Sequence, residues 1–86
     1  MKYLIVSYSA RTSVFAFSKY LQTRGVACEI INTPKSIASS CGLSIKLDFK
    51  FFNFVIENIK KINLSGFVGV FLYNSSSFYG EYQRLL

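Results

Sequence analysis

The segment Tyr-Leu-Ile-Val-Ser-Tyr at residues 3–8 decides how the rest of the chain can be arranged. It is a continuous apolar run with β-branched residues, which is typical of an internal strand buried on both faces. After it, Val14, Phe17 and Leu21 recur at helical spacing, which predicts a helix that ends just before Gly25. A buried strand followed by a helix is typical of a mixed α and β protein.

The same patterns predict the remaining elements. They are a helix from the N-cap Ser9 to Arg24, strands over 26–32 and 43–47, a helix that begins after the N-cap Asp48 and ends before Gly66, and a strand over 67–73. The order β-α-β-β-α-β is that of the ferredoxin-like split βαβ arrangement. We therefore expect an α+β fold with a four-stranded antiparallel sheet and two helices on one face. Residues 1–73 should form this single domain, and residues 74–86 a C-terminal tail that packs on the domain or on a partner.

This topology has a consequence for function. We expect the helix between the first two strands to make a right-handed crossover, so that these strands run parallel, and the third to return antiparallel to the second. The turn after the first strand and the loop over 33–42 should then lie at the same end of the sheet. We expect Arg11, Thr12, Lys35 and Cys41 to approach one another there.

The composition restricts the chemistry. The 86 residues are 51% hydrophobic and 16% charged, which excludes intrinsic disorder and leaves room for one small domain. The net charge of +6 permits attraction to nucleic acid, to anionic membranes or to acidic proteins, but does not choose among them. The chain has no histidine, which removes Ser–His and Cys–His dyads and most zinc chemistry. Two cysteines and four carboxylates remain, and we expect neither a cofactor nor a metal.

The N-terminal apolar run is too short for a signal peptide, and the uncharged stretch 62–80 is interrupted by polar residues. We therefore expect a cytoplasmic protein with reduced cysteines and no membrane partner.

Cys41 is the residue best suited to chemistry. It lies in Ser39-Ser40-Cys41-Gly42, where small neighbours leave a thiol accessible and can donate hydrogen bonds to a thiolate. Lys35, and Arg11 from the adjacent turn, can supply the positive charge that lowers the pKa of a thiol. The alternative is an ordinary loop cysteine without a chemical role.

Cys28 is expected to be different. It lies near the start of the second predicted strand, at the opposite end of the sheet from Cys41, and we expect it to be a small hydrophobic residue of the core. A disulfide between the two is not expected, because Cα atoms more than about 7 Å apart cannot be bridged without backbone movement.

The stretch 33–43 reads Thr-Pro-Lys-Ser-Ile-Ala-Ser-Ser-Cys-Gly-Leu. It resembles the motif of a family of small bacterial proteins described as selenium/sulfur carrier-like, which typically reads Thr-Pro-Arg, a spacer, and Ser-Ser-Cys-Gly-Leu. The resemblance extends over most of residues 1–73 and includes the pair Arg11-Thr12 that opens the first helix. It implies that Cys41 holds a persulfide or selenide, with donor and acceptor proteins as partners. The residues that it implies shape the loop are Pro34, Ser39, Ser40 and Gly42. Lys35 stands where the motif often has arginine, so the charge is retained but the bidentate fork is lost.

Aromatic side chains suggest a second kind of function. The two sets are Phe67, Phe71 and Tyr73 on the last strand, expected on the face away from the helices, and Phe49, Phe51 and Phe54, which fall outside the inward stripe of the second helix. We expect the tail or a second copy to cover the strand set, and a partner to contact the helix set. Stacking on RNA bases is disfavoured, because Ser65 occupies the basic position of an RNP1-like pattern.

The leading hypothesis is a small carrier or relay protein that holds sulfur or selenium on Cys41. The alternative is a non-catalytic interaction module, dimeric through its aromatic surface, with structural cysteines; RNA binding ranks third. An autonomous enzyme is not expected, since no carboxylate pair, phosphate-binding loop, metal spacing or dinucleotide fingerprint occurs in the chain.

Overall fold

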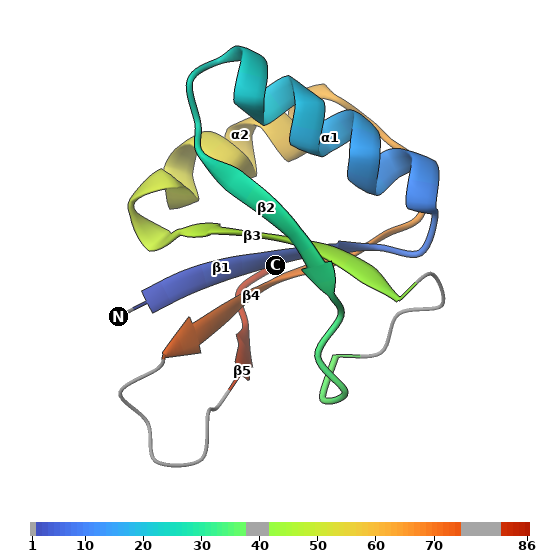
Figure 1. Cartoon of the computed structure of the whole chain (residues 1–86). Helices are drawn as coiled ribbons and strands as arrows, with labels where there is room; N and C mark the ends of the chain where they lie inside the picture. Colours follow the sequence, from blue (N-terminus) through green and yellow to red (C-terminus); the bar gives the residue numbers. More distant parts are fainter. Residues whose placement is uncertain (1, 38–41, 75–81) are drawn as a thin grey trace.

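The computed structural model describes residues 2–37, 42–74 and 82–86, and Figure 1 shows two helices on one face of a curved sheet. The elements in chain order are β1 (Lys2–Tyr8), α1 (Arg11–Thr23), β2 (Cys28–Asn32), β3 (Leu43–Asp48), a short 3-10 helix η1 (Phe49–Phe51), α2 (Phe52–Lys61), β4 (Phe67–Asn74) and β5 (Tyr82–Arg84). The predicted α+β class is confirmed.

The sheet contains five strands in the order β2-β3-β1-β4-β5, and every neighbouring pair is antiparallel. The prediction of four strands is therefore wrong. Residues 82–84 pair with the outer edge of β4, Tyr73 opposite Tyr82 and Phe71 opposite Arg84, and so satisfy backbone groups that this edge would otherwise expose. Three residues are too few for an alternating pattern to reveal a strand in the sequence.

The main core lies between the sheet and the helices. Leu4, Val6 and Tyr8 point from β1 into it, which explains why the central strand reads as an apolar run. A second, smaller cluster lies on the other face, hereafter the open face, and is formed by Ile5, Ile37 and Phe71. Both faces of β1 are thus buried, as the sequence predicts.

Gly25 ends α1 as predicted. Its φ is +76°, and two backbone bonds close the helix: Gly25 N–H to the Gln22 carbonyl (3.1 Å) and Val26 N–H to the Leu21 carbonyl (3.0 Å). This is the Schellman arrangement, in which glycine adopts the left-handed conformation at low cost. Because Val26 belongs to this motif, β2 starts at Cys28, two residues later than predicted.

The predicted cap at the start of α1 is wrong. Ala10 occupies the N-cap position with no side-chain hydrogen bond, while the Ser9 N–H donates to the Gly66 carbonyl (2.6 Å). Ser9 instead ties the chain after β1 to the chain before β4. Asp48 is predicted to cap the second helix, and it does act as a cap, since its carboxylate accepts from the Lys50 N–H (2.9 Å). The turn that it caps is η1, which leads into α2.

The phenylalanines expected to face a partner are packed within the molecule. Phe49, Phe51 and Phe54 are half-buried against the main core, and Phe49 stacks on Phe52 with ring centroids 5.8 Å apart. These rings are partly covered within the chain, and a partner contact on this helix stays a prediction. Phe49 and Phe51 belong to the short turn η1 that precedes α2, a turn that a single helical stripe does not anticipate.

The aromatic residues of β4 divide between the two faces. Phe71 and Tyr73 lie on the open face, as predicted. Phe67 does not: the register shifts between Ser7 and Tyr8, so Phe67 pairs with Tyr8 and packs against its ring at 5.6 Å. A β-bulge inserts one residue and so reverses the side-chain alternation beyond it.

Ionisation of the Tyr8 hydroxyl is expected to lower the stability of the fold at high pH. Its side chain is 1% exposed, and burial raises the pKa of its hydroxyl to about 12 from 10.0. A raised pKa means that the folded chain holds this proton more tightly, so the stabilisation is complete below pH 10 and is lost toward pH 12. We expect the free energy of unfolding to fall by up to about 1.4 kcal/mol per pH unit in this window. Urea titrations give the unfolding free energy of the wild type and of Tyr8→Phe at each pH. The two pH profiles should diverge only between pH 10 and pH 12, and profiles that stay parallel there would contradict the raised pKa of Tyr8.

Candidate functional site

The loop between β2 and β3 carries the predicted site. Cys41, Ser39 and Ser40 lie outside the described residues, whereas the flanks 33–37 and 42–44 are described. The site can therefore be built from its two ends, each of which is held by contacts to the sheet.

The base of the loop is closed by the backbone. The Thr33 N–H donates to the Gly42 carbonyl at 2.8 Å, which extends the β2–β3 ladder by one pair. Gly42, the residue after Cys41, has φ +73°, is exposed, and would meet nothing within 4 Å if it carried a Cβ. Glycine at this position adopts the left-handed conformation without strain.

Three hydroxyl groups run across the sheet beneath this base. Ser44 Oγ lies 2.7 Å from Ser7 Oγ and 2.7 Å from Thr33 Oγ1, and both serines are fully buried. The chain of hydroxyls joins β1, β3 and the end of β2 at the point where the loop begins. Sequence reasoning missed Ser7 and Ser44; the available signal was that each is a small polar residue inside an otherwise apolar strand.

Ser44 is the centre of this hydroxyl chain, so replacing it should lower the unfolding free energy more than a substitution on the surface does. Ser44→Ala leaves the hydroxyls of Ser7 and Thr33 without this partner, and we expect a loss of about 1–3 kcal/mol in unfolding free energy. The double variant Ser7→Ala/Ser44→Ala should lose less than the sum of the single variants, because it removes both members of one bond. Urea unfolding measures all three values; strict additivity would show that the serines are not coupled.

Ile37 anchors the first part of the loop. Its N–H donates to the Pro34 carbonyl (2.9 Å) and closes a turn, and its side chain, 4% exposed, packs against Ile5 and Phe71 on the open face. Burial of this one apolar side chain holds the turn against the sheet.

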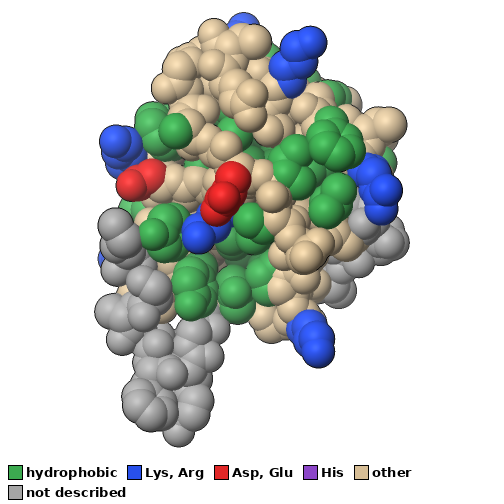
Figure 2. Space-filling view, viewed as in Figure 1, with side chains coloured by type: hydrophobic (Ala, Val, Ile, Leu, Met, Phe, Trp, Pro, Cys, Tyr) green, Lys and Arg blue, Asp and Glu red, His purple; other side chains and the backbone are tan. Residues whose placement is uncertain are grey.

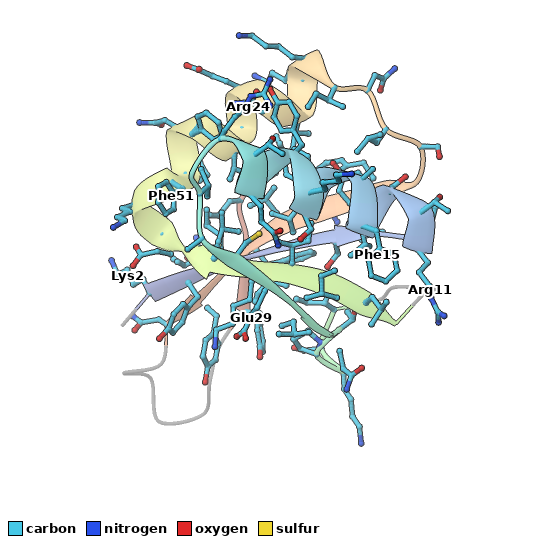
Figure 3. The ribbon with its side chains drawn as sticks, turned by 45° about the horizontal axis from the view of Figure 1, so that its top comes forward. Lys2, Arg11, Phe15, Arg24, Glu29 and Phe51 are labelled. Carbon is cyan, nitrogen blue, oxygen red and sulfur yellow. The ribbon has the colours of Figure 1, made fainter. Side chains whose placement is uncertain are left out.

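The predicted basic residues are placed at one end of the sheet but on its two sides. Arg11 and Thr12 are exposed in the first turn of α1, and Figures 1 and 3 both show this helix end above the start of β3. Lys35 is exposed in the turn anchored by Ile37, and Figure 1 shows the chain after β2 running away from the helices. No ion pair involving Arg11 or Lys35 occurs within the described part of the chain.

Cys28 lies at the far end of β2, half-buried against α1. Its Sγ is 3.6 Å from Ser18 Oγ and 3.7 Å from the Ser18 carbonyl, which accepts from the thiol. These contacts make Cys28 a packing residue that joins α1 to the edge of the sheet, as its position in the sequence predicts.

Among residues 2–37, 42–74 and 82–86, no group of three or more acidic or cysteine side chains could hold a metal ion. No helix in these ranges is long and apolar enough to cross a membrane.

The chain was compared with known proteins. A family model described as "Putative Se/S carrier protein-like" matches residues 2–66, from the start of β1 through α2 and across the cysteine loop. No curated protein and no solved structure matches. Since the match covers most of its length, the chain belongs to the Se/S carrier protein-like family.

Proposed function

We propose that this protein is a small carrier that holds a sulfur or selenium atom on Cys41. The observation that carries the proposal is the match to the Se/S carrier-like family, which spans the loop that contains Cys41. The geometry of the flanks supports it. The loop base is fixed by the Thr33–Gly42 bond and the serine hydroxyls, while Gly42 beside the cysteine is exposed and unobstructed.

The proposed transfer is an exchange between sulfur atoms. The Cys41 thiolate attacks the outer sulfur of a donor persulfide, and a new S–S bond forms on Cys41. The S–S bond of the donor breaks, and its electron pair stays on the donor sulfur as a thiolate. Attack by an acceptor thiolate on the outer sulfur of Cys41 reverses these steps, so the cycle needs neither an oxidant nor a reductant. Selenium is transferred by the same exchange.

Positive charge at this end of the sheet favours the anionic form of the thiol. Arg11 lies in the first turn of α1, the positive end of the helix dipole, and that turn contains no acidic residue. Lys35 adds a second cation from the loop itself. A thiolate close to cations is both easier to form and a better acceptor of a sulfur atom than a neutral thiol.

The fold also suits a carrier. We propose to regard α1, α2 and the strands β2-β3-β1-β4 as a ferredoxin-like unit to which β5 has been added at the β4 edge. The antiparallel pairing of these strands, with both helices on one face, supports this classification. The base of the cysteine loop, at Thr33 and Gly42, then lies at one end of the sheet, where we propose that a donor and an acceptor bind in turn.

Base stacking is not favoured by the open face. Tyr73 and Tyr82 stack on each other with centroids 4.9 Å apart, and the Lys46 ammonium lies 4.3 Å from the centre of the Tyr3 ring. These rings are engaged with neighbours of the same chain, which leaves fewer surfaces for nucleic-acid bases.

The decisive experiment is loading. The protein is incubated with a cysteine desulfurase and cysteine, then analysed by mass spectrometry without reductant and after proteolysis. We expect a mass gain of one sulfur atom on the peptide that contains Cys41. If an established carrier is loaded in the same mixture and Cys41 gains nothing, the proposal fails.

A further inference from the structure

The strand β2 forms one edge of the sheet, and its outer backbone groups are available for pairing. Within the described residues it is bonded only to β3. The bond from the Thr33 N–H to Gly42 fixes the alternation, so Glu29 and Ile31 bond toward β3. The N–H and C=O groups of Cys28, Ile30 and Asn32 therefore point away from the sheet, a row that a further strand can join.

The opposite edge is protected against such pairing. β5 has three residues, and the Arg84 guanidinium donates to the Val68 carbonyl (2.7 Å) and to the Leu86 carbonyl (3.2 Å). Short length and a charged side chain both discourage pairing at an edge. On β2 the single charged side chain is Glu29, which is directed to the open face and paired with Lys46 at 3.7 Å.

One flank of α1 lies along the β2 edge. Arg11, Phe15, Ser18 and Gln22 share a helix face, and the contact of Ser18 with Cys28 fixes this face against the start of β2. A helix rises about 1.5 Å per residue and a strand about 3.3 Å, so Phe15 lies roughly level with Ile30. Phe15 is 50% exposed, the highest value among the large hydrophobic side chains of the described residues. Figure 3 shows Phe15 and Arg11 both reaching from α1 toward the strands.

The two ends of this edge differ in charge. Beyond Asn32 lie Arg11 and Lys35, both exposed. At the Cys28 end there is a shallow depression of about 370 Å³ whose lining includes the carboxylates of Glu29 and Asp48 together with Lys46. Figure 2 shows this side of the molecule, where hydrophobic side chains lie among polar ones, the acidic side chains have basic side chains beside them, and a further basic side chain lies to the right.

We infer that a second copy of this chain occupies this edge, with β2 paired antiparallel to the β2 of its partner about a two-fold axis at Ile30. The outward groups are symmetric about Ile30, so Cys28 of one copy faces Asn32 of the other and every outward N–H and C=O finds a partner. Arg11 and Lys35 of each copy meet the end of its partner that carries Glu29 and Asp48. An acidic peptide would match Arg11 and Lys35 but would meet the carboxylates of Glu29 and Asp48 at the other end.

This arrangement forms one continuous ten-stranded sheet and brings the two Phe15 side chains together near the axis, with the α1 helices side by side. It also places Pro34 and Lys35, where the cysteine loop begins, beside the depression of the partner. The inference goes beyond the proposed function and does not depend on sulfur chemistry on Cys41.

Sedimentation equilibrium of the full chain tests the inference. We expect the wild type to sediment at twice the chain mass of 9.8 kDa. Asn32→Pro removes an outward N–H at an exposed position, and an edge strand tolerates proline there. Phe15→Glu brings two carboxylates together at the two-fold axis. Each should raise the dissociation constant at least about tenfold. The matched controls Asn32→Thr and Phe15→Leu keep the N–H and the apolar contact, so they should remain dimeric.

Circular dichroism tests whether each variant is folded. If Asn32→Pro unfolds, Phe15→Glu still tests the inference, because Phe15 lies on an exposed helix surface. A wild type that stays monomeric up to its solubility limit would overturn the inference. So would a dimer that both Asn32→Pro and Phe15→Glu leave intact, since its interface would lie elsewhere. Loss of loading on Cys41 with an intact dimer would instead count against the proposed function alone.

Discussion

Cys41→Ser is expected to lose all sulfur loading, whereas Cys28→Ser should be loaded like the wild type. The difference follows from the contacts of Cys28 and from the glycine that follows Cys41 in the chain. Cys28 is half-buried and its thiol is hydrogen-bonded to Ser18, so its sulfur is held in the packing between α1 and β2. Cys41 is followed by an exposed glycine at the mouth of a loop. Serine lacks the nucleophilic sulfur that accepts a persulfide, so the loss should be complete and not merely partial.

The same two variants separate the carrier hypothesis from that of an interaction module with structural cysteines. Mass spectrometry of the intact chains gives the loading, and urea unfolding gives the stability of each. Loading that persists in Cys41→Ser and disappears in Cys28→Ser would move the site to β2. Equal loading of both variants would indicate non-specific reaction of exposed thiols and would remove the argument for a dedicated loop.

Ile37→Asp is expected to detach the cysteine loop from the open face without unfolding the sheet. Aspartate in place of a side chain that is 4% exposed puts an unpaired carboxylate against Ile5 and Phe71. The charge can escape to water if the turn opens, because the loop base is held separately by Thr33 and Gly42. Loss of the Ile37 burial is worth about 1.5–3 kcal/mol, which corresponds to an increase of roughly tenfold to a hundredfold in the open population.

Hydrogen exchange reports this opening directly. The amide of residue 37, bonded to Pro34 in the wild type, should exchange faster in Ile37→Asp by that factor, while amides of β1 and β3 should change little. Ile37→Val keeps most of the apolar contact and serves as the matched control, with an expected cost of about 0.5–1.5 kcal/mol. Exchange at wild-type rates in Ile37→Asp would show that Ile37 does not anchor the loop. Global unfolding would show that the loop is part of the main cooperative unit.

Elements with strong local signals were predicted well. The apolar run of β1, the alternation of β3 and the stop at Gly25 all depend on interactions between near neighbours in the chain, which a sequence displays directly. The inward stripe of α2 was correct for the same reason, and its members Val55, Ile56 and Ile59 pack in the main core. The family could also be recognised from the cysteine segment, and the match over residues 2–66 confirms it.

Features that depend on distant partners were missed. The bulge that turns Phe67 toward Tyr8 arises from the pairing of β4 with β1. The hydroxyl chain requires Ser7, Thr33 and Ser44 to meet from three segments of the chain. β5 is too short to be recognised alone and exists because the edge of β4 offers backbone partners.

The sequence by itself thus determined the class of the fold, the central strand, the helix limits at Gly25 and the residue on which sulfur chemistry is proposed. Each depends on residue type and on spacing along the chain. The tertiary structure alone decided which side of the sheet each basic residue occupies, how Ile37 and the buried serines hold the cysteine loop, and that β2 is left as an edge beside Phe15. The physical reason is that burial and strand register are set by segments far apart in the chain, and a one-residue shift in register transfers a side chain to the opposite face.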